Sequence, residues 1–171
     1  MNTELRLVVP SAEHKSKATA YRQEYVDCGE QSIHGSGGLY EAENYESWLQ
    51  KITSAVTASQ TGWVNCHTYF LFLHDRIIGT IQIRETLNDL LRKSGGNIGF
   101  GIVPSARNKG YGVQMLMLAL EKCRQLHMKK VLITCDKGNI ASEKTIIKGG
   151  GGLENTILEN GCIVKRYWID L

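Results

Sequence analysis

The chain has 171 residues, of which 42% are apolar and 22% are charged, and it contains two prolines. This length suits one domain, over residues 1–171, that buries roughly 70% of the surface its unfolded chain exposes. The composition excludes a disordered or collagen-like chain. A net charge of +3 gives no electrostatic argument for a nucleic-acid partner.

The sequence also lacks the features of membrane, secreted and metal-binding proteins. Its apolar runs, such as residues 69–73, are far shorter than the ~20 residues that span a bilayer, and residues 1–15 show no secretory signal. The cysteines form no Cys-x-x-Cys pair, and no histidine lies at zinc-finger spacing from two of them: Cys28, Cys66, Cys123, Cys135 and Cys162. We therefore expect a cytoplasmic protein with reduced thiols, no metal and no membrane partner.

The first forty residues predict a strand, a helix and a loop. Residues 5–9 alternate weakly between polar and apolar side chains before Pro10, which is typical of a strand. A helix follows between Ser11, a suitable N-cap, and Gly29, a suitable stop. Its apolar stripe consists of Ala18, Tyr21 and Tyr25. Residues 31–40 form a glycine-rich loop.

The next segment predicts a second helix and a hairpin. Apolar residues recur at helical spacing and form one stripe: Tyr45, Trp48, Leu49, Ile52 and Val56. Two β runs at residues 68–73 and 77–84 are joined by His74-Asp75-Arg76, which indicates an antiparallel hairpin.

The remaining chain predicts alternating strands and helices. Residues 97–103 indicate a strand that Pro104 stops, and 130–135 indicate another. The helix between them has an apolar stripe of Val113, Leu116, Met117, Leu120 and Cys123. A short helix over 141–148 ends at four glycines, and Asn160-Gly161 favours a type I′ hairpin turn. The order predicts an α/β (α+β) domain with a central mixed sheet and helices on its faces.

The segment from Val103 to Gly112 joins a strand to the start of an amphipathic helix. The free N–H groups and the dipole at a helix start favour an anion. Gly110 and Gly112 let the backbone approach a phosphate closely, and Arg107 and Lys109 add positive charge.

Two other known phosphate-binding loops differ from this segment at required positions. A Walker loop requires Gly-x-x-x-x-Gly-Lys-Ser/Thr, which is absent. A dinucleotide fingerprint requires a third glycine where Met115 stands, although Asp136 lies at a strand end where a ribose-binding acid is expected. Nucleotide binding at this loop therefore remains a weaker alternative.

The loop motif resembles the acetyl-CoA motif of the GNAT N-acetyltransferase superfamily. That motif is Arg/Gln-x-x-Gly-x-Gly/Ala after a strand and a proline, and Arg107-x-x-Gly110-x-Gly112 matches it in full. The resemblance extends to the strand at 131–136, to Asn139 after it, and to the helices and hairpin upstream. Short segments at 35–39, 83–84, 87–88 and 166–169 are similar to a bacterial branch of predicted acetyltransferases. The resemblance implies a GNAT-like fold, with a mostly antiparallel central sheet and a C-terminal hairpin.

The resemblance also implies where acetyl-CoA binds. The pyrophosphate is expected on the loop amides, and the pantetheine arm between two splayed parallel strands, where it pairs with the backbone. The residues expected to bind acetyl-CoA are Ile102, Val103, Arg107, Asn108, Lys109, Gly110, Tyr111, Gly112, Asn139 and Ser142. Asn139 also suits a helix cap.

Acetyl transfer from a thioester to an amine places three demands on the site. The amine must lose a proton, since an alkylammonium has a pKa of about 10.4. The oxyanion needs a donor, for which an amide near Ile102 is suitable. The thiolate, with a pKa of about 8.5, benefits from an acid. The family's tyrosine at that position is replaced by Ile146 here, which leaves Ser142, Cys135 and Tyr167 as candidate acids.

For the base that deprotonates the amine, the first candidate is Glu85, which ends the hairpin strand before the loop. The alternative interpretation of Glu85 is a solvated strand-end glutamate. His67, His34 and Glu30 are further candidates, and the last two belong to the loop expected to border the acceptor pocket together with the helix that carries Trp48.

These observations predict an N-acetyltransferase that moves an acetyl group from acetyl-CoA to a primary amine by direct attack. The acceptor is a small molecule or a peptide, and the family leads us to expect a homodimer. The alternative is a non-catalytic module that binds and senses acyl-CoA, which the absence of the family's tyrosine favours.

Overall fold

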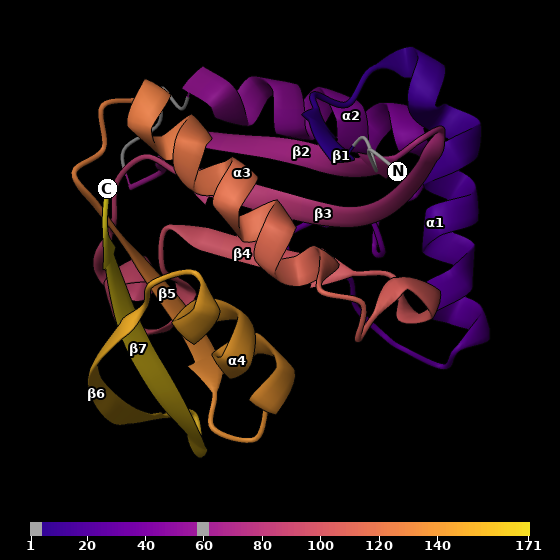
Figure 1. Ribbon diagram of the computed structural model, residues 1–171. Helices are drawn as coiled ribbons and strands as arrows, with labels where there is room; N and C mark the ends of the chain where they lie inside the picture. Colours follow the sequence, from indigo (N-terminus) through magenta and orange to yellow (C-terminus); the bar gives the residue numbers. More distant parts are fainter. Residues whose placement is uncertain (1–4, 58–61) are drawn as a thin grey trace.

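A computed structural model describes residues 5–57 and 62–171, and its elements follow the predicted order (Figure 1). These elements are β1 (Leu5–Val8), α1 (Lys15–Asp27), α2 (Tyr45–Ser54), β2 (Cys66–Leu73), β3 (Arg76–Arg84), β4 (Ile98–Ile102), α3 (Tyr111–Gln125), β5 (Lys130–Asp136), α4 (Ile140–Lys148), β6 (Gly152–Glu159) and β7 (Cys162–Asp170). The β6–β7 turn has positive φ angles of 50° at Asn160 and 80° at Gly161, as a type I′ turn requires.

The strands form two sheets. One has the order β1-β2-β3-β4 and the other the order β5-β7-β6, and every recorded pair is antiparallel. The mostly antiparallel architecture is therefore confirmed, but the expected single sheet is divided in two. The reason is that β4 and β5 meet at one end and then diverge (Figure 1). We call the region in which they diverge the splay.

Asn97, just before β4, joins the two sheets at the closed end of the splay. Its N–H donates to the Leu132 carbonyl at 2.7 Å, and its carbonyl accepts from Arg84 N–H at 2.8 Å. Its side chain repeats the pattern: Nδ2 donates to the Arg84 carbonyl at 2.9 Å, and Oδ1 accepts from Leu132 N–H at 2.8 Å. Only 3% of its surface is exposed, and Asn97 joins the two sheets by four hydrogen bonds, two to Arg84 of β3 and two to Leu132 of β5.

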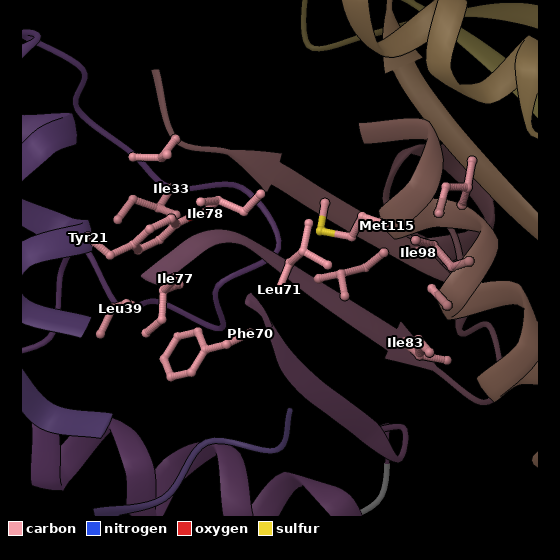
Figure 2. Packing of buried hydrophobic residues seen from close by; sticks show 14 of the residues in the cluster. Tyr21, Ile33, Leu39, Phe70, Leu71, Ile77, Ile78, Ile83, Ile98 and Met115 are labelled. Atoms are coloured by element: carbon pink, nitrogen blue, oxygen red, sulfur yellow. The ribbon is translucent and has the colours of Figure 1, made fainter. Parts of the chain in front are cut away.

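Helices cover both faces of the four-stranded sheet. On one face, Tyr21 of α1 is hydrogen-bonded to Thr80, and Trp48 of α2 stacks on Phe70 with ring centroids 5.5 Å apart. On the other face, α3 packs against β3, where Met115 lies against Gly79. Figure 2 shows these two halves of the core, with Phe70, Leu39 and Tyr21 on one side and Leu71, Ile83, Ile98 and Met115 on the other.

The buried face of α3 differs from the predicted stripe. Met117 is 49% exposed, whereas Met115 and Ala119 are fully buried. A Cβ atom at Gly79 would lie 3.0 Å from Met115 Sδ. Because Gly79 of β3 has no side chain, there is room for Met115, and α3 presents positions 115 and 119 to the sheet.

We expect Asn97→Ala to lower the free energy of unfolding by about 2–4 kcal/mol, because the buried Leu132 N–H and Arg84 carbonyl would lose their partners. Urea denaturation measures this loss. The control is Asn155→Ala on the exposed β6 strand, for which a loss below about 1 kcal/mol is expected. Equal losses in the two variants would contradict the role given to Asn97.

Candidate functional site

The start of α3 is a backbone cradle suited to an anion. Gly110 precedes the helix with a φ of 81°, and no side chain caps the helix. The first turn of a helix lacks intrahelical acceptors for its N–H groups. Within residues 5–57 and 62–171, no other group accepts from those of Tyr111, Gly112 and Val113. These amides and the helix dipole favour negative charge at this place.

The cradle opens beside the end of β4 and the first turns of α4. A Cβ atom at Gly112 would lie 3.3 Å from Thr145 Oγ1 and 3.9 Å from Ile102 Cγ1. The loop that leads into the cradle holds Asn108 in the left-handed region with a φ of 60°, which asparagine tolerates better than most residues. Strand end, loop and helix α4 therefore meet at Gly112.

The two cations predicted to face a phosphate make contacts within the protein. Arg107 forms a bidentate ion pair with Glu30, with N–O distances of 2.5 and 2.9 Å, and this pair raises the pKa of Arg107. Arg107 Nε also donates to the Ile102 carbonyl at 2.9 Å, and Lys109 Nζ donates to the Ser105 carbonyl at 2.9 Å. Arg107 is thus paired with a carboxylate, and Glu30, a predicted base, is held by Arg107.

The end of β4 divides its backbone groups between β3 and the splay. Val103 donates its N–H to the Ile78 carbonyl at 2.9 Å, and its carbonyl accepts from Ala106 N–H. Successive strand residues point their N–H groups in opposite directions, so the N–H of Ile102 faces away from β3. Both backbone groups of Val103 are therefore hydrogen-bonded within the protein, and of these two residues Ile102 has the N–H that faces the splay.

Helix α4 borders the cradle on its other side. The side-chain oxygen of Asn139 accepts from Ser142 N–H at 3.0 Å, which confirms the capping role. Residues three apart share a helix face, so Ser142 lies on the same side of α4 as Thr145, which faces Gly112. Ile146 is fully buried and supplies no acid.

Two of the three candidate acids hold their protons tightly. The Tyr167 hydroxyl donates to Glu143 Oε1 at 2.7 Å, and Lys165 Nζ lies 2.6 Å from the same oxygen. Burial and this carboxylate raise the pKa of Tyr167, and burial raises the pKa of Cys135. Both groups are therefore poorer acids than a free phenol or thiol. Ser142 is the remaining candidate beside the cradle.

Glu85 lies on the α3 side of the sheet. Its Oε1 is 2.7 Å from Nε2 of His67, and His67 is paired with Ile83, whose side chain faces α3. The preceding residue, Arg84, points to the opposite face because strand side chains alternate. The structure therefore places both Glu85 and His67 on the side of the sheet opposite to the cavity described next.

A cavity of about 640 Å³ lies on the α2 side of the four-stranded sheet. The glycine-rich loop at residues 32–38, helix α2 and strand β3 contribute its walls. Its ionisable lining side chains are His34, Glu41, Lys51, Cys66 and Arg84. Of the predicted bases, His34 lines the cavity. Sequence reasoning did not single out Arg84, although the alternation along residues 76–84 places it on the same face as Gln82.

The described residues show two further absences. No helix among them is long and apolar enough to cross a membrane. No group of three or more His, Cys, Asp or Glu side chains among them is arranged to hold a metal ion.

The chain is similar to proteins of known structure and to one family of known function. A family model described as an acetyltransferase (GNAT) domain matches residues 6–151. The structure of RimL, a ribosomal alpha-N-protein acetyltransferase in complex with coenzyme A, is 17% identical over 100% of this chain and 96% of that chain, with a TM-score of 0.73. The microcin C7 self-immunity acetyltransferase MccE, in complex with acetyl-CoA and AMP, is 16% identical over 99% and 94%, with a TM-score of 0.71.

A third similar structure is that of Mycobacterium smegmatis RimJ in complex with CoA-disulfide. It is 14% identical over 97% of this chain and 81% of that chain, with a TM-score of 0.73. No curated protein sequence matches the chain significantly. At these identities the structural likeness concerns the fold.

The Glu143 contacts predict a pH dependence of stability. Hydrogen bonds from Lys165 and Tyr167 hold the pKa of Glu143 below its ordinary value of 4.5. Its carboxylate therefore stabilises the folded chain above pH 4.5, and this contribution is lost as the pH falls through the lowered pKa. We expect Glu143→Gln to be less stable than the parent at about pH 7, with a difference that shrinks as the pH falls from 4.5 through the lowered pKa.

Urea denaturation across this pH range measures the difference between parent and variant. Glu159→Gln is the control, because no ion pair is recorded for Glu159 in the described chain. A Glu143→Gln deficit that stays constant with pH would show that the carboxylate's charge does not contribute.

Proposed function

The chain belongs to the GNAT acetyltransferase family, and on that basis we propose that it is a single-domain enzyme that transfers an acetyl group from acetyl-CoA to a primary amine by direct attack. The observation that carries the proposal is the amide cradle at the start of α3, which opens beside the splay. The cradle supplies unpaired backbone donors, and a phosphate is the type of group that such donors bind at a helix start.

We assign the pyrophosphate of acetyl-CoA to the backbone of the cradle. The residues concerned are Asn108, Lys109, Gly110, Tyr111 and Gly112. The N–H of Ile102 would pair with the pantetheine arm, and Ser142 would contact the arm from α4. Arg107 contributes by fixing the loop through Glu30 and Ile102, and Asn139 contributes by capping α4.

The chemistry that acetyl-CoA supplies is an activated thioester. We propose that Ile102 N–H donates to the oxyanion, since it faces the splay rather than β3. The amine would approach through the cavity on the opposite side of β4, where His34 is the candidate base that lines the path. Ser142 is the candidate donor to the departing thiolate.

Thiol release tests the proposal as a whole. The purified chain is incubated with acetyl-CoA and primary amines of different charge, and free coenzyme A thiol is followed over time. Release that depends on an amine supports acetyl transfer. Tight binding of acetyl-CoA in calorimetry without any release would instead support the non-catalytic acyl-CoA-binding module, for which Ile146 in the family's tyrosine position argues.

We expect Gly112→Val to weaken acetyl-CoA binding roughly 10-fold or more, because a branched side chain would enter the cradle beside Thr145 and Ile102. Isothermal calorimetry measures the affinity, and circular dichroism checks the fold. Gly138→Val is the matched control, because a Cβ atom there meets nothing within 4 Å. Unchanged affinity in a folded Gly112→Val variant would exclude the cradle as the phosphate site.

The base is tested by parallel pH–rate series on Glu85→Gln and His34→Gln. A lost base lowers turnover at neutral pH by about 10²–10⁴-fold, and the deficit shrinks at high pH, where the amine arrives neutral. We expect this pattern for His34→Gln. For Glu85→Gln we expect near-parental turnover, because its carboxylate is bound to His67 on the α3 side. The reverse result would restore Glu85 as the base.

A further inference from the structure

Arg84 occupies the cavity at a point where β4 carries no side chain. A Cβ atom at Gly99 would lie 3.5 Å from Arg84 Nη2 and 3.7 Å from Nη1. The guanidinium group therefore lies against the bare backbone of β4, and it lines the cavity together with Gln82 of the same strand. The backbone of Arg84 is held in place because its N–H and its carbonyl are both hydrogen-bonded to Asn97.

The hydrogen-bond partners of Arg84 are all neutral. Nη1 donates to the carbonyls of Gly95 and Gly96 at 3.0 and 3.1 Å, and Nη2 donates to Gln82 Oε1 at 3.5 Å. A guanidinium group has five N–H donors. Two of them, Nε–H and the second Nη2–H, have no acceptor in the described part of the chain.

Arg84 also has no counter-charge. Among residues 5–57 and 62–171, no carboxylate lies within 4.0 Å of its guanidinium, whereas Arg76 and Arg107 pair with Glu24 and Glu30. Burial of Arg84 lowers its pKa, which reports the cost of keeping a charge where water is partly excluded. A half-buried cation without an anion is stabilised when an anion binds beside it.

The charge of the cavity lining agrees with this argument. Lys51 and Glu41 carry opposite charges and are both exposed, so they balance each other. The positive charge of Arg84 then remains in excess within the lining that the structure describes. A volume of about 640 Å³ is within the range of pockets that hold small ligands, and it has room for a ligand of the size of a dipeptide.

We propose that the acceptor amine carries an anionic group, a carboxylate or a phosphate, which Arg84 binds in this cavity. The proposal rests on the proposed acetyl transfer and adds the substrate class. A planar guanidinium with two N–H groups to offer binds two oxygens of either anion at once. Arg84 is in this view a specificity-determining residue that orients the acceptor, with its amine directed toward the splay.

The first experiment compares matched acceptors with the parent enzyme. Glycyl dipeptides with a free carboxylate are set against the same dipeptides as C-terminal amides, whose amines have similar basicity. Phosphoethanolamine is set against ethanolamine, and spermidine serves as a cationic amine. We expect a kcat/KM roughly 10-fold or more higher for the anionic member of at least one pair. The pair that shows the preference identifies the anion as carboxylate or phosphate.

The second experiment removes the charge with Arg84→Gln. We expect the preference for the anionic acceptor to disappear through a raised KM, while kcat/KM for the neutral acceptor stays within about 3-fold of the parent value. If the role of Arg84 were only structural, the substitution would lower kcat/KM equally for the anionic and the neutral acceptor. Arg124→Gln is the matched control, because Arg124 is an exposed arginine on α3 whose ion pair is with Glu121.

Because Arg84 also holds the Gly95 and Gly96 carbonyls, each variant is first checked by acetyl-CoA calorimetry. If Arg84→Gln does not fold, Arg84→Lys keeps the charge but loses the two-oxygen geometry, and a smaller preference is expected.

The outcomes separate the two proposals. Transfer to neutral amines or spermidine at least as fast as to every anionic acceptor would overturn the role of Arg84 and leave acetyl transfer intact. If none of the amines tested causes release of coenzyme A thiol, acetyl transfer is overturned and, with it, the proposed substrate class.

Discussion

The site depends on one asparagine that binds two sheets at a single point. Asn97 uses its backbone and its side-chain amide in parallel, so that Arg84 of β3 and Leu132 of β5 are held on either side of it. A regular strand pair would have continued along β4 and β5 and closed the sheet. With the contact limited to one end, the twist of each sheet carries the strands apart, and the N–H of Ile102 faces the splay.

Helix α3 follows directly from this geometry. It leaves the open end of the splay and returns across the face of the four-stranded sheet to the start of β5 (Figure 1). Its N-terminus, with its unpaired amides, is therefore placed at the open end. The closed end carries the backbone bonds that fix Arg84. The two ends of one strand, β4, thus separate the amide cradle at the start of α3 from the part of the cavity that holds Arg84.

The sequence predicted the order of the elements because periodicity and turn residues are local signals. The Asn160-Gly161 turn and the stop at Pro104 are examples. The division into two sheets was not predictable in this way, because it depends on hydrogen bonds between residues 97 and 132, far apart in the chain. The same reason applies to the site. The Arg107–Glu30 pair and the side of the sheet taken by Glu85 are set by contacts over long separations, whereas the helix start at Gly110 was visible in the motif.

The glycine-rich loop gives the cavity a wall made largely of backbone. A Cβ atom at Gly35 would lie 2.3 Å from the Gly99 carbonyl oxygen, and one at Gly37 would lie 2.8 Å from Ile52 Cγ2. Both glycines have positive φ angles, so side chains are excluded by space and by conformation. For protein engineering, the shape of this wall therefore cannot be changed by substitutions at Gly35 or Gly37. Redesign of the cavity has to act through the side chains that face this wall. Under the role proposed for Arg84, its replacement by a neutral residue would remove the preference for an anionic acceptor.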